Sequence, residues 1–276
     1  MSLFRNKLIV LTGATGGIGQ ALGRQLAAQG ATLMLVGRNR KCLDELDTTL
    51  QVQANGGLTV VADLATEAGR ATLKQAVRSF ARPVDILING VGASCFGTLE
   101  QLSDVEIERT IHTNVLTPIL ITRALLAELN PSGASIVNIG SVFGSIGFPG
   151  FSLYCASKFA LRGFNEALRR ELADRPIDVH YIAPRATRTA MNSDSVNAMN
   201  RELNIAMDSP DCVAAACLKT ISKKRKERYI GWPERLFVKL NQCWPAIVDM
   251  ALARQLPTVR RYAQRQESPP RSEVQQ

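Results

Sequence analysis

Short apolar runs alternate with longer amphipathic stretches from residue 7 onward. Seven runs are rich in Val, Ile and Leu and are bounded by Gly, Asp or Asn. They lie at residues 7–12, 31–37, 57–62, 84–89, 134–140, 177–183 and 229–231. Runs that are apolar throughout are typical of parallel strands that other elements cover on both faces. The pattern therefore predicts a parallel sheet of about seven strands.

The stretches between these runs show the spacing of apolar residues that is typical of helices. They lie at residues 17–29, 39–54, 66–80, 103–129, 151–173 and 210–222. Strands that alternate with helices predict an α/β fold, in which one doubly wound sheet carries helices on both faces. Such sheets bind ligands beyond the carboxyl ends of their strands, so the residues that follow each strand are candidates for function.

The pattern changes to a basic, amphipathic tail over residues 232–266. Proline is tolerated in the first turn of a helix, so Pro233, Pro245 and Pro257 predict three short helices. An apolar stripe beside basic residues is formed by Leu236, Phe237, Leu240, Trp244, Ile247, Val248 and Ala251. The stripe predicts a membrane-surface segment or a lid over a lipophilic pocket, and packing on the chain's own body or on a second subunit explains it equally well. The polar residues 267–276 predict a disordered end.

Length and segment composition limit the domain organisation. A chain of 276 residues fits one long α/β domain, which we expect over residues 1–231. No stretch reaches the roughly 18 uninterrupted apolar residues of a membrane-spanning helix, and the amino terminus has no apolar signal core. We therefore expect a cytoplasmic protein, with any membrane association coming from the tail.

The net charge of +9 is concentrated in one segment. Residues 219–265 hold 12 Lys and Arg against 3 Asp and Glu, whereas basic and acidic residues balance in the remainder. A neutral body with a basic tail argues against a nucleic-acid-binding core. It predicts an acidic partner for the tail, such as a membrane or an acidic carrier protein.

The cysteines and histidines show no metal-site spacing. The six cysteines form no CxxC pair, and neither His112 nor His180 completes a zinc pattern. We expect reduced, mostly buried thiols, structural histidines and no metal ion. Cys155 is expected to face the core.

The segment LIVLTGATGGIGQAL places a strand, a glycine turn and a helix start in succession. Gly13 permits a tight turn, Gly17 lets the backbone approach a pyrophosphate, and Gly19 lets the helix lie close to the sheet. The amino end of the helix would offer free N–H groups and a positive dipole to the phosphates. This segment predicts a dinucleotide site.

The end of the second strand indicates which dinucleotide binds. An acidic residue there would bond the ribose 2′-hydroxyl of NAD, but the chain has Gly37 followed by Arg38. A guanidinium suits a 2′-phosphate, with Arg40 or Lys41 as further help. We predict NADP(H), while Arg38 as the start of a solvated helix is the simpler alternative.

Tyr154 and Lys158, with Ser141 thirteen residues before the tyrosine, lie in YCASK and IGS segments. Together with TGATGGIG at 12–19, DL at 63–64, NGVG at 89–92 and Asn114, this ordered set resembles the short-chain dehydrogenase/reductase family over about residues 7–231. The resemblance implies a single Rossmann-like domain and an NADP-preferring oxidoreductase similar to 3-oxoacyl reductases. By the same resemblance, Asn114 would hold a water that links Lys158 to solvent.

The spacing of the catalytic set has a chemical reason of its own. Residues four apart share a helix face, so the Lys158 ammonium is expected near the Tyr154 phenol, where it would lower the phenol pKa. The tyrosine would then exchange a proton with a substrate whose carbonyl oxygen Ser141 holds by a hydrogen bond. The nicotinamide would supply the reducing equivalents.

The resemblance also implies further cofactor contacts, in which Asp63 would meet the adenine, Asn89 would stabilise the strand end and Thr189 would touch the nicotinamide amide. The implied set is Gly13, Thr15, Gly17, Ile18, Gly19, Arg38, Asp63, Leu64, Asn89, Gly90, Tyr154, Lys158, Pro184 and Thr189. Helix capping by Asp63, turn formation by Asn89 and a helix start at Thr189 are the structural alternatives.

Two positions depart from the family pattern. Gly90 replaces the second asparagine of the usual pair, and Arg185 follows Pro184 where glycine is usual. Arg185 must turn away from the nicotinamide or contact a phosphate or an acidic substrate. Between residues 188 and 209, which the resemblance marks as the substrate lid, Met191, Met199 and Met207 fit ligand contact and core packing equally well.

The leading interpretation is an NADPH-dependent reductase of a lipophilic or carrier-bound ketone, such as a 3-oxoacyl thioester. A non-catalytic NADPH sensor or scaffold, with substrate access lost at Arg185, is the alternative. Sugar epimerases and dehydratases of the extended relatives rank third, because their glycine spacing differs. The resemblance implies a homodimer or homotetramer formed through helices 103–129 and 151–173.

Overall fold

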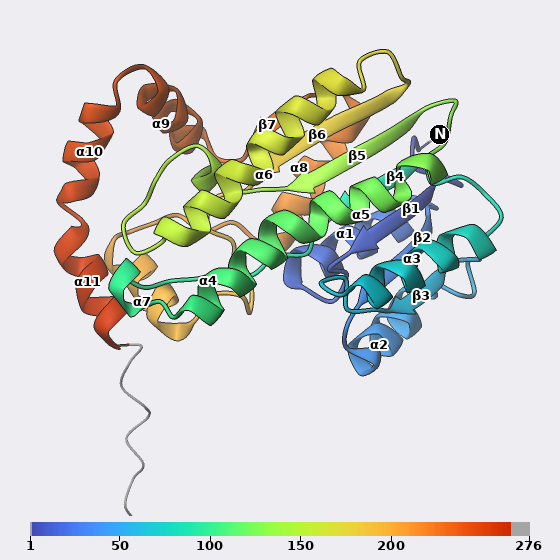
Figure 1. Ribbon diagram of the computed structural model, residues 1–276, viewed down its shortest axis with the longest axis horizontal. Coiled ribbons are helices and arrows are strands. Elements are labelled where there is room, and N and C mark those ends of the chain that lie inside the picture. The colour runs from blue at the N-terminus through green and yellow to red at the C-terminus, as the bar shows by residue number, and fades with distance from the viewer. Residues whose placement is uncertain (1, 266–276) are drawn as a thin grey trace, which may run out of the picture.

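The predicted apolar runs form one parallel sheet in the computed structural model, which describes residues 2–265 (Figure 1). The strand order is β3-β2-β1-β4-β5-β6-β7, so the direction of winding reverses between β1 and β4. The strands are β1 (Leu8–Thr12), β2 (Thr32–Gly37), β3 (Leu58–Val61), β4 (Ile86–Asn89), β5 (Ala134–Ile139), β6 (Ile177–Ala183) and β7 (Glu227–Tyr229). The predicted doubly wound α/β fold is confirmed.

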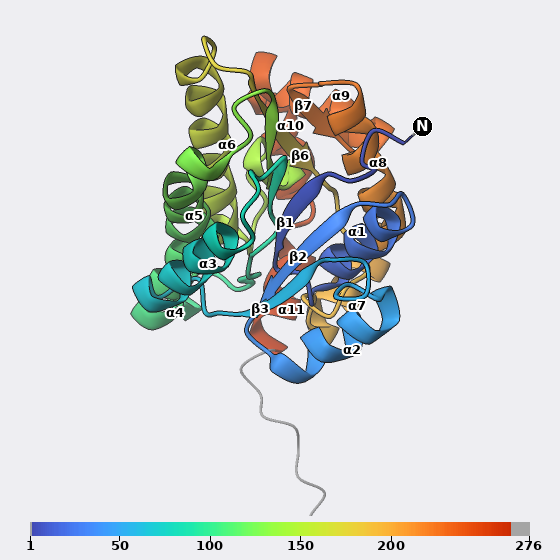
Figure 2. The same cartoon turned by 90° about the vertical axis from the view of Figure 1, so that its right-hand side faces the viewer.

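Helices cover both faces of this sheet. They are α1 (Gly17–Ala27), α2 (Arg40–Leu50), α3 (Glu67–Ser79), α4 (Asp104–Ile111), α5 (Thr117–Leu125), α6 (Ser152–Glu171), α7 (Asp194–Glu202) and α8 (Pro210–Ser222). Figure 2, which views the sheet from its β3 edge, shows α3, α5 and α6 on one side and α1, α2 and α8 on the other.

The first strand shows why apolar runs become central strands. All five residues of β1 are buried. Ile9 and Leu11 pack in the cluster that contains Leu22 of α1 and Val213 of α8. Leu8 and Val10 pack on the opposite face, in the cluster that contains Leu73 of α3 and Ile121 of α5. Successive side chains of a strand point to opposite faces, so a strand with two buried faces needs apolar residues throughout.

The helix predicted over residues 103–129 is present, but it is not a regular α-helix throughout. The segment consists of α4, a π-helical turn (His112–Leu116), α5 and a short 3-10 turn (Leu126–Glu128). Pro118 has no N–H, so it cannot donate to the carbonyl four residues earlier in a continuous α-helix. The wider turn accommodates this loss, and the side chain of Thr117 donates to the His112 carbonyl at 3.0 Å. The turn also carries Asn114 inward, where it is fully buried.

Two predicted boundaries also shift. The helix expected to run to residue 54 ends at Leu50, because Gln51 adopts a left-handed conformation with φ of 51°. The last strand lies at Glu227–Tyr229 and not at residues 229–231. Gly231 instead has a positive φ of 95° and begins the turn into the tail.

The tail forms the three short helices that its prolines predicted, α9 (Trp232–Cys243), α10 (Pro245–Ala253) and α11 (Leu256–Arg265). They curve around the carboxyl end of the sheet and return to α7 (Figure 1). Val238 of α9 and Val248 of α10 pack on Val142 and Ile146, in the loop that follows β5. Residue 266 and the predicted disordered end, 267–276, lie outside the described residues. Within residues 2–265, no helix is long and apolar enough to cross a membrane.

Candidate active site

The glycine turn joins β1 to the uncapped amino end of α1. Gly13 has φ of 67°, and a side chain there would stand 2.6 Å from the Gly90 carbonyl oxygen. A side chain at Gly19 would stand 2.2 Å from the Gly13 carbonyl oxygen, so the helix lies directly on the turn. In the described chain, no side chain caps α1 and no acidic residue lies in its first turn. The backbone N–H groups of that turn are therefore free to bind an anion.

Arg38 lies where the sequence places it, exposed at the carboxyl end of β2. It follows the buried Gly37, at which a side chain would stand 3.3 Å from the Thr15 methyl carbon. Gly37, which precedes Arg38, thus lies beside Thr15 of the glycine turn.

The side chains of Asp63 and Thr66 both accept hydrogen bonds from backbone amides at the start of α3. The Asp63 carboxylate accepts a hydrogen bond from the Ala65 amide at 3.1 Å. The cap of α3 is Thr66, whose hydroxyl accepts from the Gly69 amide at 3.0 Å. Asp63 is exposed and shapes the turn before the helix, while Leu64 is buried in the core.

The Asn89 side chain points away from the glycine turn and into a buried chain of amides. Its Nδ2 donates to Asn138 Oδ1 at 2.9 Å and lies 3.0 Å from the Thr122 hydroxyl. Asn138 in turn donates to Asn165 Oδ1 at 2.9 Å. These bonds tie the ends of β4 and β5 to α5 and α6, and they place the backbone of Gly90 beside Thr12, whose hydroxyl accepts from the Gly90 amide at 3.2 Å. Asn89 therefore holds the carboxyl end of β4 in position.

Tyr154 and Lys158 lie one turn apart on α6 and face the carboxyl ends of β4 and β5. Lys158 Nζ is 5.6 Å from the centre of the Tyr154 ring. The same ammonium donates to the Ile139 carbonyl of β5 at 3.2 Å, and Lys158 is only 4% exposed. This contact with β5 fixes the direction in which the long lysine side chain points.

Burial controls both pKa values. Desolvation raises the pKa of Tyr154 to about 12, and a side-chain hydrogen bond with Ser141 opposes the rise only in part. Desolvation also lowers the pKa of Lys158 to about 8. The predicted lowering of the tyrosine pKa by the ammonium is not found, because desolvation is the largest influence and Lys158 is not among the groups that shift this pKa. Near neutral pH, Tyr154 is a neutral phenol and hence a proton donor.

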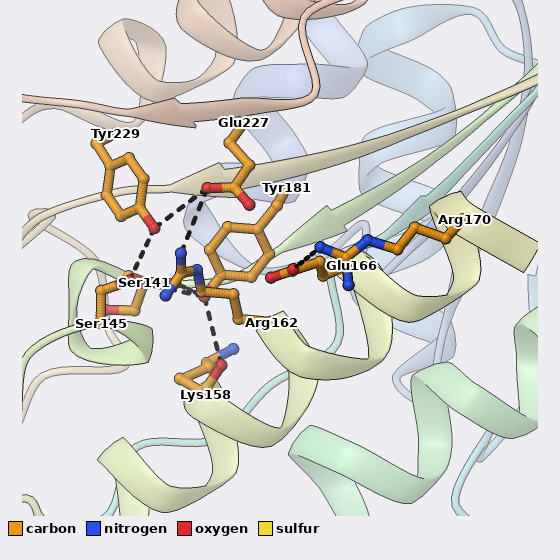
Figure 3. A network of polar contacts seen from close by, with 9 residues as sticks. All are labelled: Ser141, Ser145, Lys158, Arg162, Glu166, Arg170, Tyr181, Glu227 and Tyr229. Atoms are coloured by element: carbon orange, nitrogen blue, oxygen red, sulfur yellow. Dashed lines mark hydrogen bonds and ion pairs between the residues drawn. The ribbon is translucent and has the colours of Figure 1, made fainter. Parts of the chain in front are cut away.

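Ser141 follows β5, which ends at Ile139, and it begins the short 3-10 turn at Val142–Gly144. Its hydroxyl accepts from the Phe143 amide at 3.1 Å. Its main chain contacts a residue that the sequence reading missed, Tyr181 of β6. The Tyr181 hydroxyl lies 3.2 Å from the Ser141 carbonyl oxygen and 3.4 Å from that of Lys158, and it accepts from the Ser141 amide at 3.3 Å (Figure 3).

The Tyr181 ring fits beneath the loop because two glycines make room for it. A side chain at Gly140 would stand 2.1 Å from the ring, and one at Gly144 would stand 2.2 Å from the hydroxyl oxygen. Tyr181 is fully buried. A neighbouring tyrosine, Tyr229, bonds the Ser145 hydroxyl at 2.8 Å (Figure 3). Two tyrosines from β6 and β7 thus support the loop that carries Ser141.

Asn114 is held in place by its neighbours. Its Nδ2 donates to the Ala93 carbonyl at 2.9 Å and to the Ser157 hydroxyl at 3.0 Å, and its Oδ1 accepts from the Ala93 amide at 2.8 Å. A side chain added at Gly92 would stand 3.5 Å from Asn114 Oδ1 and 3.6 Å from Lys158 Nζ. Asn114 and Lys158 therefore border the same space, and the water that would link them stays a prediction.

The loop after β6 closes toward the glycine turn. A side chain at Gly17 would stand 2.8 Å from the Thr189 methyl carbon. Pro184 is buried, and its carbonyl accepts from the Val142 amide at 2.9 Å. Ile18 is half-buried against the core of the sheet. Thr189 thus lies beside the glycine turn, while Pro184 lies beside the loop that follows β5.

Arg185 turns away from that space. Its Nη2 lies 2.8 Å from Asp208 Oδ1, and its Nη1 lies 3.2 Å from Glu234 Oε1 of α9. The two carboxylates raise the pKa of the guanidinium above its usual value. Of the two roles that the sequence left open, contact with a phosphate or an acidic substrate is wrong for this structure, because the guanidinium is already paired.

The lid contains three methionines in three different settings. Met199 is buried and packs with Phe151 and with Val259 of α11, whereas Met191 is about half exposed. Met207 lines a hollow of about 650 Å³. The other residues of the hollow are Arg188, Thr189, Ala190, Asn197, Arg201 and Ile205. Met199 thus serves core packing, whereas Met191 lies at the surface.

Among residues 2–265, no three or more His, Cys, Asp or Glu side chains lie close enough together to hold a metal ion. All six cysteines are free thiols, of which Cys155 and Cys217 are buried. His180 is buried, and its Nδ1 lies 2.6 Å from the Arg225 carbonyl oxygen. Burial lowers its pKa.

Comparisons with known proteins agree with this geometry. A family model described as short chain dehydrogenase matches residues 7–200. The chain is 30% identical over 257 residues to the ketoacyl reductase HetN of a Nostoc species, a match that covers 90% of this chain and 89% of the relative. A short-chain dehydrogenase from Sphingobium yanoikuyae in complex with NADPH superposes with a TM-score of 0.73 at 27% identity, over 88% of this chain and 95% of the other. A Burkholderia phymatum relative in complex with NAD reaches 0.78 at 23% identity over 88% and 95%, which shows the shared fold.

Proposed function

The chain belongs to the short-chain dehydrogenase/reductase family of oxidoreductases, and on that basis we propose that it reduces a lipophilic or carrier-bound ketone with NADPH. One observation carries the proposal. The Tyr154 phenol, Lys158 Nζ at 5.6 Å from its ring, and Ser141 meet at the carboxyl edge of the sheet, beside the glycine turn. This is the arrangement that proton transfer to a bound carbonyl oxygen requires.

Each member of the set has a separate task. Ser141 would hold the carbonyl oxygen, and Tyr154, neutral because its pKa is about 12, would donate the proton as negative charge develops there. Lys158 would keep the phenol in position, and Asn114 would hold the water through which the proton is replaced. When bound, the nicotinamide supplies the reducing equivalents.

NADPH is proposed as the cofactor because of the end of β2. Gly37 offers no carboxylate to a ribose 2′-hydroxyl, and the exposed Arg38 offers a guanidinium to a 2′-phosphate. The uncapped first turn of α1 would take the pyrophosphate. Thr15, Gly17, Ile18, Asp63, Leu64, Asn89, Pro184 and Thr189 would complete the cofactor site.

The surroundings of Tyr154 favour an apolar substrate. The ring centres of Phe143 and Phe151 lie 6.3 and 6.2 Å from that of Tyr154. Phe148 stacks on Phe143 at 5.2 Å. A 3-oxoacyl chain would find apolar contacts here, and the ketoacyl reductase activity in the name of the Nostoc relative supports this substrate class. A basic tail would suit an acidic carrier protein.

We also propose a cytoplasmic homodimer or homotetramer. Leu116, in the turn before α5, and Phe159 of α6 are each 43% exposed. Large apolar side chains exposed on neighbouring helices favour burial against a second subunit. Against the alternative of a non-catalytic sensor, we note that Arg185 is paired with Asp208 and Glu234, so it is held by carboxylates of the chain itself.

The test measures the oxidation of NADPH by the purified protein with a panel of ketones that includes 3-oxoacyl thioesters. NADH is measured beside it as the control. We expect turnover with NADPH and a 10²- to 10⁴-fold loss of kcat in Tyr154→Phe with NADPH binding retained. Near-normal turnover of that variant would overturn the mechanism. Tight NADPH binding without turnover of any ketone would instead favour the sensor.

A further inference from the structure

The outer side of α9 and α10 exposes six large apolar side chains, which we call the tail face. Their exposed fractions are 72% for Trp232, 54% for Leu236, 45% for Phe237, 63% for Trp244, 47% for Ile247 and 65% for Met250. Each of these two helices buries only one residue, Val238 in α9 and Val248 in α10. Apolar surface of this kind, gathered on neighbouring helices, is typical of a site that another surface covers.

The charges around the tail face are mainly positive. Arg235, Lys239 and Arg254 are exposed on the same helices. Of the two acidic residues in this segment, Glu234 is paired with Arg185, so only the exposed Asp249 opposes the cations. A second copy of the chain would bring like charges together if it covered this face, whereas an anionic surface would meet opposite charges.

We propose that the tail face docks on an anionic lipid bilayer. The apolar side chains would enter the boundary between headgroups and acyl chains, and the cations would meet the lipid phosphates and carboxylates. The two tryptophans favour this depth, because an indole has both an apolar body and a polar N–H group.

Helices α9 to α11, which we call the arm, carry the tail face and are fixed to the loops that follow β5 and β6 and to α7. Arg185 holds Glu234 of α9 at 3.2 Å, and Asn241 of α9 donates to the Ser145 carbonyl at 3.0 Å. At the far end, the Ser195 hydroxyl of α7 donates to the Tyr262 carbonyl of α11 at 2.7 Å. A docked arm therefore sets the distance of the substrate loop and α7 from the bilayer.

This geometry suggests that a lipophilic ketone would enter from the bilayer. That consequence rests on the proposed function, but docking itself does not and is measured without turnover. Trp232 and Trp244 are the only tryptophans of the chain, and both belong to the tail face. Tryptophan fluorescence therefore reports on this surface alone.

The experiment titrates the full chain with vesicles of phosphatidylcholine, with and without phosphatidylserine. We expect a blue shift of the emission and co-sedimentation with the vesicles that contain phosphatidylserine, both weakened by salt. Combining Trp244→Gln, Ile247→Gln and Met250→Gln should lower the partition coefficient at least about tenfold, because three apolar groups no longer leave water. Leu3→Gln, at a residue 56% exposed at the amino end of the chain, is the matched control and should bind like the wild type.

Three results would overturn the proposal. The first is no binding to vesicles that contain phosphatidylserine, and the second is binding that the triple variant leaves unchanged. The third is a wild-type chain that self-associates but does not bind vesicles, together with a triple variant that no longer self-associates. The tail face would then be a contact between copies of the chain. NADPH oxidation with a water-soluble ketone is measured in parallel, so failure to dock and failure to catalyse are distinguishable.

Discussion

The body of the molecule and its tail bury their apolar residues in different ways. Every residue of β1 is buried, and each face of the sheet has its own core cluster. By contrast, α9 and α10 bury one residue each and expose six large apolar side chains between them. Packing against the rest of the chain therefore determines the residues of the body. The large apolar side chains of the tail face are exposed in the described chain, and the proposed contact with a bilayer would cover them.

Core substitutions give the largest contrast between the two regions. Leu35→Ala in β2 should lower the free energy of unfolding by about 2–5 kcal/mol, because a fully buried side chain leaves a cavity between packed layers. Val248→Ala in α10 should cost less, about 1.5 kcal/mol, because the change removes only two methyl groups and the cluster around Val248 is small. Urea titrations of the two variants measure both values, and equal losses would contradict the contrast.

A second prediction concerns a place in the body where function opposes stability. The pKa of Lys158 falls from 10.5 to about 8 on burial, so the folded state disfavours the charged form. Lys158→Met should abolish turnover but raise the free energy of unfolding at pH 7 by on the order of 1–3 kcal/mol. The gain in stability is full below about pH 8, where Lys158 is protonated in both states of the wild type. It shrinks between about pH 8 and 10.5, where only the unfolded chain keeps the proton, and it disappears at higher pH.

Unfolding at pH 7 and at pH 10 tests the sign of this effect. The exposed Lys223→Met is the control and should change stability little at either pH. A Lys158→Met variant that is less stable than the wild type at pH 7 would show that the bond to the Ile139 carbonyl outweighs the cost of burying the charge.

The choice of cofactor should depend on the body alone. Arg38→Ser should raise the KM for NADPH about tenfold or more and leave that for NADH unchanged, because only NADPH carries the 2′-phosphate. Arg235→Ser removes the same charge from the tail and should alter neither constant. Steady-state kinetics with both cofactors measure these KM values. An equal rise of KM for NADPH and NADH in Arg38→Ser would show that Arg38 does not recognise the 2′-phosphate.

The smallest effect is expected at the link between the two regions. Glu234→Gln weakens the bond from Arg185 to α9, which is partly exposed, so the free energy of unfolding should fall by less than about 1 kcal/mol. Hydrogen exchange should nevertheless become faster in residues 232–254 and stay unchanged in β1 and β4. Faster exchange in those strands would mean that the ion pair stabilises the body.

The sequence was sufficient for the sheet, the glycine turn and the order of the catalytic residues, because strands with two buried faces and ligand-binding turns have local signatures. It was insufficient where distant groups compete. The π-helical turn depends on Pro118 and on the buried site that receives Asn114. The raised pKa of Tyr154 depends on burial, which the spacing of YCASK does not reveal.

Tyr181 is the clearest example of such a limit. In the run IDVHYIA it is an ordinary strand residue, and its role arises only from the glycines that face it. Cys155, by contrast, was correctly expected to face the core, because its place on α6 follows from helical spacing alone.

The fit between Tyr181 and its two glycines also restricts how this protein can diverge. With the tyrosine present, any side chain at position 140 or 144 would overlap it, so neither glycine can change first. Exchange of Tyr181 for a small residue would open position 140 to substitution, but a side chain at position 144 would still stand 2.8 Å from the Lys158 carbonyl oxygen. Position 140 can therefore change only after position 181 has changed, whereas position 144 is restricted to glycine by the backbone of α6 as well.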